Sequence, residues 1–355
     1  MKGIIRRIFR DQSADVRFSI IGIYLILGAA NIAVWIWAYL AFHSHPALLA
    51  MALLAYGFGL RHAVDADHIA AIDNVVRKLM QEAKRPVSVG FFFSLGHSTV
   101  VVLMAAAVAV FASALQGRFE AFKEVGGIIG TSVSAFFLLL VAVMNIFIMA
   151  GTYKTFCRVK SGGRYDEEDM NMILARGGLL ARIFRPVFKL IRKSWHMYPL
   201  GFLFGLGFDT ATEVALLAIS ATEASKGLPV WSVLVFPALF TAGMSLVDTT
   251  DGILMLGAYG WAFLNPLRKL YYNITVTAVS VLVALLVGGI EALGLIRDEF
   301  AFDGRFWDMV RSLNDNFGNL GYAIIGIFAV CWIVSAAVYR AKGYDKITVI
   351  ASPAN

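Results

Sequence analysis

ALLAMALLAYGFGLRHAVDADHIAAI, residues 47–72, is the stretch that decides the fold of this chain. It is mostly apolar and long enough to cross a hydrocarbon layer of ~30 Å as a helix. Within it, residues 61–69 (RHAVDADHI) place an arginine, two histidines and two aspartates. Ionisable groups at membrane depth are costly and usually mark a function. The stretch therefore predicts a membrane span that carries a functional site.

The composition of the whole chain also indicates a membrane protein. Of its 355 residues, 59% are hydrophobic and 15% are charged, and the mean hydropathy is +0.72. One soluble core could not bury so much apolar surface. Because apolar runs of spanning-helix length recur, we expect an all-α, polytopic integral membrane protein with eight transmembrane helices. These helices are expected near residues 18–43, 47–72, 87–115, 126–151, 198–222, 230–258, 270–296 and 319–340.

The distribution of positive charge predicts the orientation. With a cytoplasmic N-terminus, most of the 31 Lys and Arg residues fall on the inner side, so the positive-inside rule places both termini in the cytoplasm. The first apolar run is too long for a cleaved signal peptide and is expected to be a retained helix. The net charge of +7 is explained by contact with anionic membrane lipid and requires no nucleic-acid partner.

The chain is expected to consist of two halves joined by a loop. Residues 1–151 form the first half, with transmembrane helices 1–4 and the RHAVDADHI motif, and residues 198–355 form the second half, with helices 5–8. Residues 152–197 form a basic cytoplasmic loop, in which an apolar stripe opposite Arg and Lys residues predicts a helix on the inner membrane surface.

The two halves carry a short internal repeat. Gly59 and Gly205, each followed by leucine, precede a shared F-x-x-G-x-S-x-V pattern at residues 93–100 and 240–247. In the expected topology the second and fifth spans run in opposite directions, so the repeat would be inverted, as is typical of secondary transporters. Chance similarity between Gly-rich apolar helices is the alternative explanation.

Histidines and aspartates of the second span predict a metal site. On one continuous helix, His62, Asp65 and His68 form one arc, whereas Asp67 points largely away from them. His97, midway through the next span, can complete the set. A lone buried histidine is more often a core residue, but three histidines with carboxylates in adjacent spans favour a site for a borderline divalent metal such as Ni, Co or Zn.

Arg61 and the isolated asparagines are expected to be structural. Arg61 stays protonated and cannot bind a cation. We expect it to form an ion pair with Asp67 or another carboxylate, the alternative being an arginine that reaches towards lipid headgroups. Asn145 and Asn273 are expected to hydrogen-bond between helices.

Two acidic pairs in the second half are expected to line a transport pathway. Asp209 and Glu213 are four residues apart, and Asp248 and Asp251 are three apart, so each pair shares one helix face. They could bind the cation in transit, carry protons or balance Arg61, and the sequence leaves these roles open.

These motifs resemble those of the nickel/cobalt transporter (NiCoT) family of bacterial and fungal membrane permeases. The resemblance rests on four stretches, residues 61–69 (RHAVDADHI), 93–101 (FSLGHSTVV), 206–213 (LGFDTATE) and 243–251 (GMSLVDTTD). It implies high-affinity uptake of Ni²⁺ and/or Co²⁺ across the cytoplasmic (inner) membrane of a bacterium. The residues that match the family signatures are His62, Asp65, Asp67, His68, His97, Asp209, Glu213, Asp248 and Asp251.

The expected function is therefore a secondary transporter rather than an enzyme. Ni²⁺ or Co²⁺ would be the transported substrate, with no permanently bound cofactor, and the lack of a Walker A motif gives no indication of an ATPase subunit. Related exporters carry a His-rich loop, whereas the central loop here has only His196, which favours import. The alternatives are an exporter, a proton- or sodium-coupled antiporter, and a membrane-embedded metal-dependent hydrolase, although the chain lacks an H-E-x-x-H motif.

Overall fold

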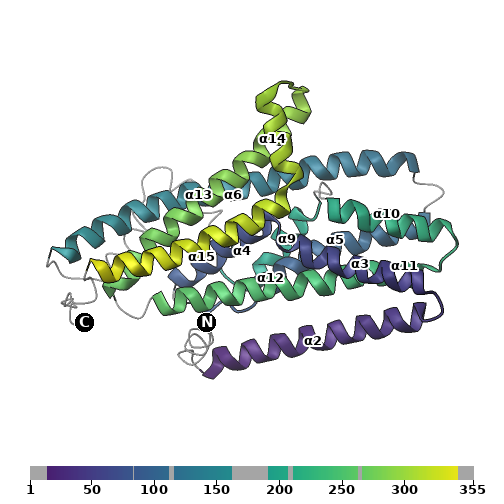
Figure 1. Ribbon diagram of the computed structural model, residues 1–355, viewed down its shortest axis with the longest axis horizontal. Helices are drawn as coiled ribbons and strands as arrows, with labels where there is room; N and C mark the ends of the chain where they lie inside the picture. The colour runs from purple at the N-terminus through teal and green to yellow at the C-terminus, as the bar shows by residue number, and fades with distance from the viewer. Residues whose placement is uncertain are drawn as a thin grey trace.

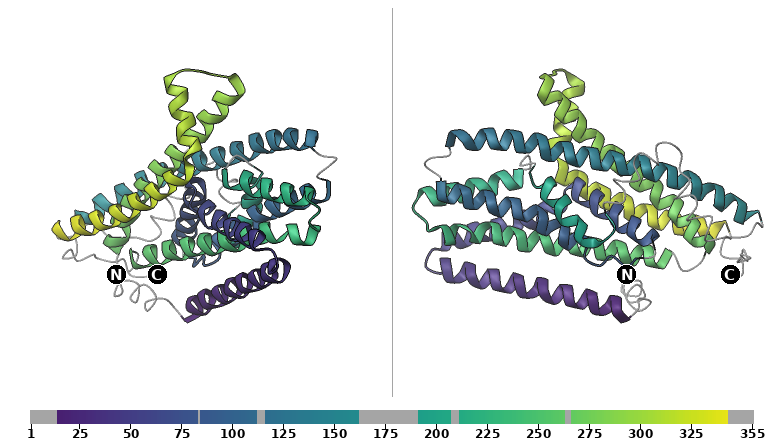
Figure 2. Two further views of the ribbon diagram at one scale, coloured as in Figure 1. Left: turned by 45° about the vertical axis from the view of Figure 1, so that its right-hand side comes forward. Right: turned by 180° about the vertical axis from the view of Figure 1, so that it is seen from behind.

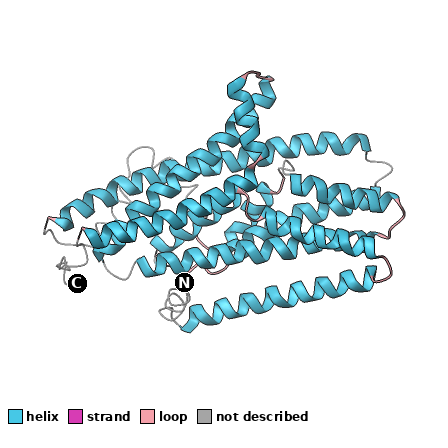
Figure 3. Ribbon diagram, viewed as in Figure 1, coloured by secondary structure: helices cyan, strands magenta, loops and turns pink. Residues whose placement is uncertain are grey.

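The computed structural model describes residues 14–82, 84–111, 116–161, 191–206, 211–262 and 266–342. Over these ranges the chain is a bundle of helices with short connections, and the described residues contain no strand (Figures 1 and 3). The prediction of an all-α fold is thereby confirmed.

The helices of the first half come before residue 162. They are α2 (Ala14–Phe42), α3 (Pro46–His62), α4 (Ala66–Gln81), α5 (Val89–Phe111) and α6 (Gln116–Lys160). The second half begins with a short 3₁₀ helix, η1 (Ser194–His196). It continues with α9 (Met197–Phe204), α10 (Ala211–Ser225), α11 (Val230–Val233), α12 (Val235–Ala262), α13 (Pro266–Phe300), α14 (Arg305–Asp315) and α15 (Phe317–Ala341). The predicted interfacial helix of the central loop lies outside the described residues.

Six helices are long and apolar enough to cross a membrane, so the protein is a multi-pass membrane protein. They are α2, α5, α6, α12, α13 and α15. The pair α3 and α4 adds a seventh if it counts as one bent span. The predicted fifth span corresponds to two short helices, α9 and α10, and neither is long enough to be counted among the spans. Eight spans therefore stay a prediction.

The second span was predicted as one continuous helix, and this prediction is wrong because the helix is broken. Helix α3 ends at His62, α4 begins at Ala66, and the two are bent by 51°. In the break, the backbone N–H groups of Val64 and Asp65 bond back three residues to Arg61 and His62. Asp65 is extended and stands at the N-cap of α4, where its carboxylate makes no capping hydrogen bond and instead lies 2.9 Å from His62 Nδ1.

Helix α4 lies in the interior of the bundle, whereas α3 buries one face and exposes Leu53 and Leu54 on the other. Helix α12 packs against α2, α3, α4 and α5, and α13 packs along α6. In contrast, α2 and α15 lie at the edge of the bundle (Figure 2) and expose large apolar side chains such as Phe18, Leu25 and Ile333. An apolar outer surface around buried polar groups is the arrangement expected in lipid.

Helices α3 and α4 run in the opposite direction to α9 and α10 (Figure 1). In Figure 1, α3 and α4 run from right to left, whereas α9 and α10 run from left to right. The start of α2 and the end of α15 lie towards the same end of the bundle.

A buried arginine joins the inner part of α4 to its neighbours. Arg77 is 1% exposed and donates from Nη1 to Thr277 on α13 (2.9 Å) and from Nη2 to Asn74 (2.7 Å). Asn145 on α6 donates to Asn74 (2.9 Å) and accepts a longer bond from Arg77 (3.4 Å). These four residues, here called the arginine cluster, tie α4 to α6 and α13. The expectation that Asn145 bonds between helices is confirmed.

Candidate metal site

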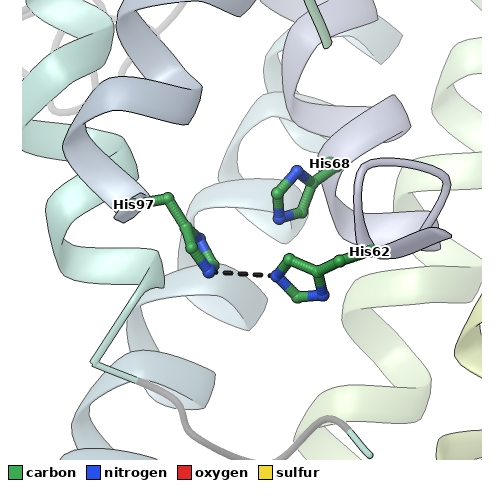
Figure 4. Close-up of side chains that lie close together, drawn as sticks. All are labelled: His62, His68 and His97. Atoms are coloured by element: carbon green, nitrogen blue, oxygen red, sulfur yellow. Dashed lines mark hydrogen bonds between the residues drawn. The ribbon is translucent and has the colours of Figure 1, made fainter. Parts of the chain in front are cut away.

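Three histidines converge inside the bundle (Figure 4). His62 is the last residue of α3, His68 lies in the first turn of α4, and His97 lies on α5. One ring nitrogen from each can be chosen so that all three lie within 4.8 Å of one another. The rings are 1%, 0% and 2% exposed, so the cluster is shielded from the surroundings.

Glu213 brings a carboxylate to the same place. It lies in the first turn of α10, and its Oε1 atom is 2.8 Å from His97 Nε2 and 3.7 Å from His62 Nε2. The two Nε2 atoms are 3.0 Å apart. Ligand atoms ~2.1 Å from one ion lie about 3.0 Å apart at right angles and about 3.4 Å apart at tetrahedral angles. The three separations are therefore close to those around a single bound ion.

Two further carboxylates orient the histidine rings. Asp65 Oδ2 lies 2.9 Å from His62 Nδ1, and the carboxylate oxygens of Asp248 lie 3.2 and 3.3 Å from His68 Nδ1. Because an ionised carboxylate only accepts, each Nδ1 donates, and each Nε2 keeps its lone pair. His68 Nε2 is buried with no hydrogen-bond partner among the described residues. Metal-binding histidines commonly have this arrangement, with the second nitrogen held by a carboxylate.

Aromatic rings enclose the histidines. Phe93 on α5 meets His68 edge-on, with ring centroids 4.9 Å apart, and Phe240 on α12 lies 5.4 Å from His62. Phe93 and Phe240 are both fully buried. An apolar wall strengthens electrostatic interactions at the centre, since it keeps water away from the charged groups.

Arg61 is paired, but its partner is Asp65. Arg61 Nη1 lies 3.6 Å from Asp65 Oδ1, and the arginine side chain is 42% exposed. The sequence predicted an ion pair with Asp67 or another carboxylate, and the structure places Arg61 beside Asp65, because the break in the helix turns Asp65 back towards the end of α3. Asp67 Oδ1 is buried without a hydrogen-bond partner in the described part of the chain.

The acidic pairs do not stay together as units. Glu213 and Asp248 contact histidines, whereas Asp251 lies beyond them, with Oδ2 buried and unpaired among the described residues. The Asp251 carboxylate interacts electrostatically with Asp248 and with Asp73 of α4. Asp209 lies outside the described residues.

Sequence reasoning missed three features around the histidines. It did not assign Glu213 and Asp248 to particular rings, because those contacts join residues 116 and 180 positions apart. It also missed Thr212, whose hydroxyl lies 3.4 Å from His62 Nδ1. Away from the histidines, Asp73 of α4 accepts a 2.7 Å hydrogen bond from Ser280 of α13, and it was not singled out from the sequence either.

Comparison with known proteins agrees with this geometry. The profile of the NicO family, described as High-affinity nickel-transport protein, matches residues 48–338. A relative from Cupriavidus necator, named High-affinity nickel transport protein, is 60% identical over 339 residues, which cover 96% of this chain and 97% of the relative.

More distant relatives carry related names. High-affinity nickel-transport protein NixA of Helicobacter pylori strain J99 is 44% identical over 304 residues, covering 84% of this chain and 91% of the relative. Cobalt transport protein NhlF of Rhodococcus rhodochrous is 40% identical over 321 residues, covering 88% and 89%. No solved structure matches the chain. With a match across most of its length and relatives this similar, the chain belongs to the NicO family of high-affinity nickel-transport proteins.

Proposed function

We propose that this protein is a secondary transporter that takes up Ni²⁺ and/or Co²⁺ across the cytoplasmic membrane of a bacterium. The observation that carries the proposal is the convergence of three buried histidines and Glu213 inside a membrane bundle. The relatives' names, which include nickel and cobalt transport, support the same substrates.

The histidines and Glu213 would bind the ion directly. His62 and His68 would each supply Nε2, and Glu213 would supply a carboxylate oxygen. His97 would supply Nε2 when the ion replaces the proton that this atom donates to Glu213. Asp65 was expected from the sequence to be a ligand, but its bond to His62 Nδ1 supports an orienting role. Asp248 would orient His68 in the same way.

The ligand set would determine which ions are accepted. Imidazole nitrogens bind borderline transition metals well, whereas Mg²⁺ and Ca²⁺ prefer oxygen ligands. The single carboxylate at the centre would offset part of the ion's charge. Such a site can replace the water that the ion must lose before it crosses the bilayer.

The remaining acidic residues would line the transport pathway of the ion. Asp67 and Asp251 each hold a buried carboxylate oxygen without a hydrogen-bond partner in the described residues, which suits groups that meet the ion in transit. Asp209 would belong to the same route by its place in the matching motif.

For the architecture we propose eight spans, both termini in the cytoplasm and an inverted repeat of the two halves. Helices α9 and α10 would together form the broken fifth span, as α3 and α4 form the second. His62 and Glu213 lie beside the two breaks. Binding sites built where two discontinuous helices meet are typical of transporters with inverted repeats.

Reciprocal glycine contacts support the repeat. A Cβ atom on Gly59 of α3 would overlap the carbonyl oxygen of Phe240 on α12, and one on Gly201 of α9 would overlap that of Phe93 on α5. In return, Gly243 faces the Tyr56 carbonyl.

The fourth contact makes the two sets of contacts equivalent, because Gly96 of α5 faces the Tyr198 carbonyl of α9 as Gly243 faces that of Tyr56. Each half therefore contributes a Y-x-x-G helix that packs on the F-x-x-G helix of the other half. In these contacts Gly59 corresponds to Gly201, one helical turn before the Gly205 of the sequence alignment.

The energy source would be an ion gradient or the membrane potential. No permanently bound cofactor and no ATPase subunit are proposed, since the chain carries no Walker A motif. The basic inner segments would contact anionic lipid.

The test is uptake of radiolabelled nickel by cells that express the protein. We expect accumulation that cobalt inhibits more strongly than manganese does, and that falls when a proton uncoupler collapses the membrane potential. His62→Ala at a matched membrane level should remove it. Lowered nickel content in expressing cells would instead identify an exporter, and full uptake by His62→Ala would disprove the assigned site.

A further inference from the structure

The last described helix touches the break between α3 and α4. A Cβ atom on Gly321 of α15 would overlap the carbonyl oxygen of Val64 and lie 2.8 Å from its carbonyl carbon. It would also lie 3.3 Å from Ile69 Cδ1. The backbone of α15 thus rests directly on the break, at a distance that only glycine permits.

In the sequence, Val64 lies between His62 and His68. The break is held by backbone hydrogen bonds that span three residues, from Val64 N–H to the Arg61 carbonyl (3.0 Å) and from Asp65 N–H to the His62 carbonyl (2.9 Å). A carbonyl in so tight a turn cannot move without moving its neighbours. A shift of Val64 would therefore be transmitted to His62 on one side and to His68 on the other.

The packing around this contact is apolar and continuous. Ile324 and Phe328 of α15 are buried in the same core as Ile69, and Leu320 and Val64 pack against that core. Gly326, one and a half turns further along α15, has open space around the position of a Cβ atom. Only one of these two glycines, then, is required for close approach.

We propose that Gly321 is a positioning residue for the metal site, with α15 acting as a support that fixes the separation of His62 and His68. The inference rests on the proposed function, because it assumes that these histidines bind the transported ion. A side chain at Gly321 would push the break inward or α15 outward, and would change the size of the site. Affinity and the preference between nickel and cobalt would then change together.

The experiment compares Gly321→Ala with Gly326→Ala, two identical substitutions on one helix. Nickel and cobalt uptake would be measured over a range of concentrations at matched membrane levels, and nickel binding would be measured on purified protein by equilibrium dialysis. For Gly321→Ala we expect KM and the dissociation constant for nickel to rise about tenfold, in the range seen for changes behind metal ligands, with an altered nickel-to-cobalt ratio. Gly326→Ala should match the wild type.

A purely structural role for Gly321 predicts a different result. The variant would then show a lower thermal midpoint or membrane level, with KM and the nickel-to-cobalt ratio unchanged, and that outcome would overturn the inference. If wild-type protein itself neither binds nor transports nickel, the proposed function fails instead. These two failures are distinct because the first leaves the wild type active.

A second variant covers the case in which Gly321→Ala does not fold. Leu320→Ala removes part of the apolar packing of α15 against the core that contains Ile69, and Ile327→Ala, at a 44% exposed position of α15, is its control. We expect a rise of about threefold in KM for nickel with Leu320→Ala, smaller than the tenfold change expected for a disturbed metal shell. An unchanged KM in folded Leu320→Ala protein would refute the support role of α15.

Discussion

Two polar clusters lie along α4, about 13 Å apart along the helix axis, and they are built in opposite ways. Around His68, nitrogen and oxygen atoms of four elements point at a common centre, and His68 Nε2 has no partner in the described chain. Around Arg77, the two terminal nitrogens bond to Asn74, Asn145 and Thr277, and Nε has no hydrogen-bond partner among the described residues. Both clusters are buried and both contain charge.

The difference separates a ligand site from a structural one. A buried polar atom without a partner carries a free-energy penalty, and where such an atom converges with other ring nitrogens and a carboxylate, as around His68, a bound ion can satisfy them together. Satisfied networks instead fix helices relative to one another. The histidine cluster should therefore respond to mutation in its metal affinity, whereas the arginine cluster should respond in its stability.

The largest effect is expected for His97→Ala, which removes one ligand while α5 stays intact. Removing a residue that hydrogen-bonds to a metal ligand typically lowers metal affinity about 10–100-fold. Because His97→Ala removes a ligand itself, we expect nickel affinity to fall more than about 100-fold and uptake to fall near background. Uptake assays at matched membrane levels would measure it. His43→Ala, which alters an exposed histidine outside the cluster, should leave uptake unchanged.

The next effect is expected for Glu213→Gln, which keeps the shape of the side chain and removes its charge. We expect KM for nickel to rise about 10–100-fold, because a neutral amide no longer offsets the charge of the ion. Glu223→Gln on the same helix is the control, since Glu223 pairs with Lys226 instead of a histidine. Equal KM values for the two variants would show that Glu213 is not a ligand.

A smaller effect is expected for Asp248→Asn, because an amide oxygen can still accept from His68 Nδ1. We expect about a tenfold loss of nickel affinity, measured by equilibrium dialysis on purified protein. If Asp248 acts through His68, adding the substitution to a His68→Ala background should cause no further loss. An additive loss in the double variant would assign Asp248 a separate role.

Much of this arrangement was predictable from local sequence. Apolar runs of spanning length predicted the helices, and His62, His68 and His97 were recognisable because imidazole is unusual at membrane depth. Asn145 was likewise expected to bond between helices, and it does.

The rest depends on contacts between distant segments. The bond of Asp65 to His62 is a local contribution to the break in residues 61–69, but the close approach of Gly321 to Val64 comes from a distant helix. The pairing of Asp65 with Arg61 follows from that break. Glu213 reaches the histidines because the start of α10 packs beside the end of α3, a contact between distant segments.

The smallest effect on metal affinity is expected for Arg77→Lys, which tests the other side of the comparison. Lysine keeps the positive charge but cannot bond Asn74 and Thr277 with a planar fork, so we expect a loss of about 2 kcal/mol in stability. The thermal midpoint of purified protein should fall, while the KM for nickel changes less than about twofold, well below the tenfold expected behind a metal ligand. A raised KM with an unchanged midpoint would contradict the distinction and bring Arg77 into the transport pathway.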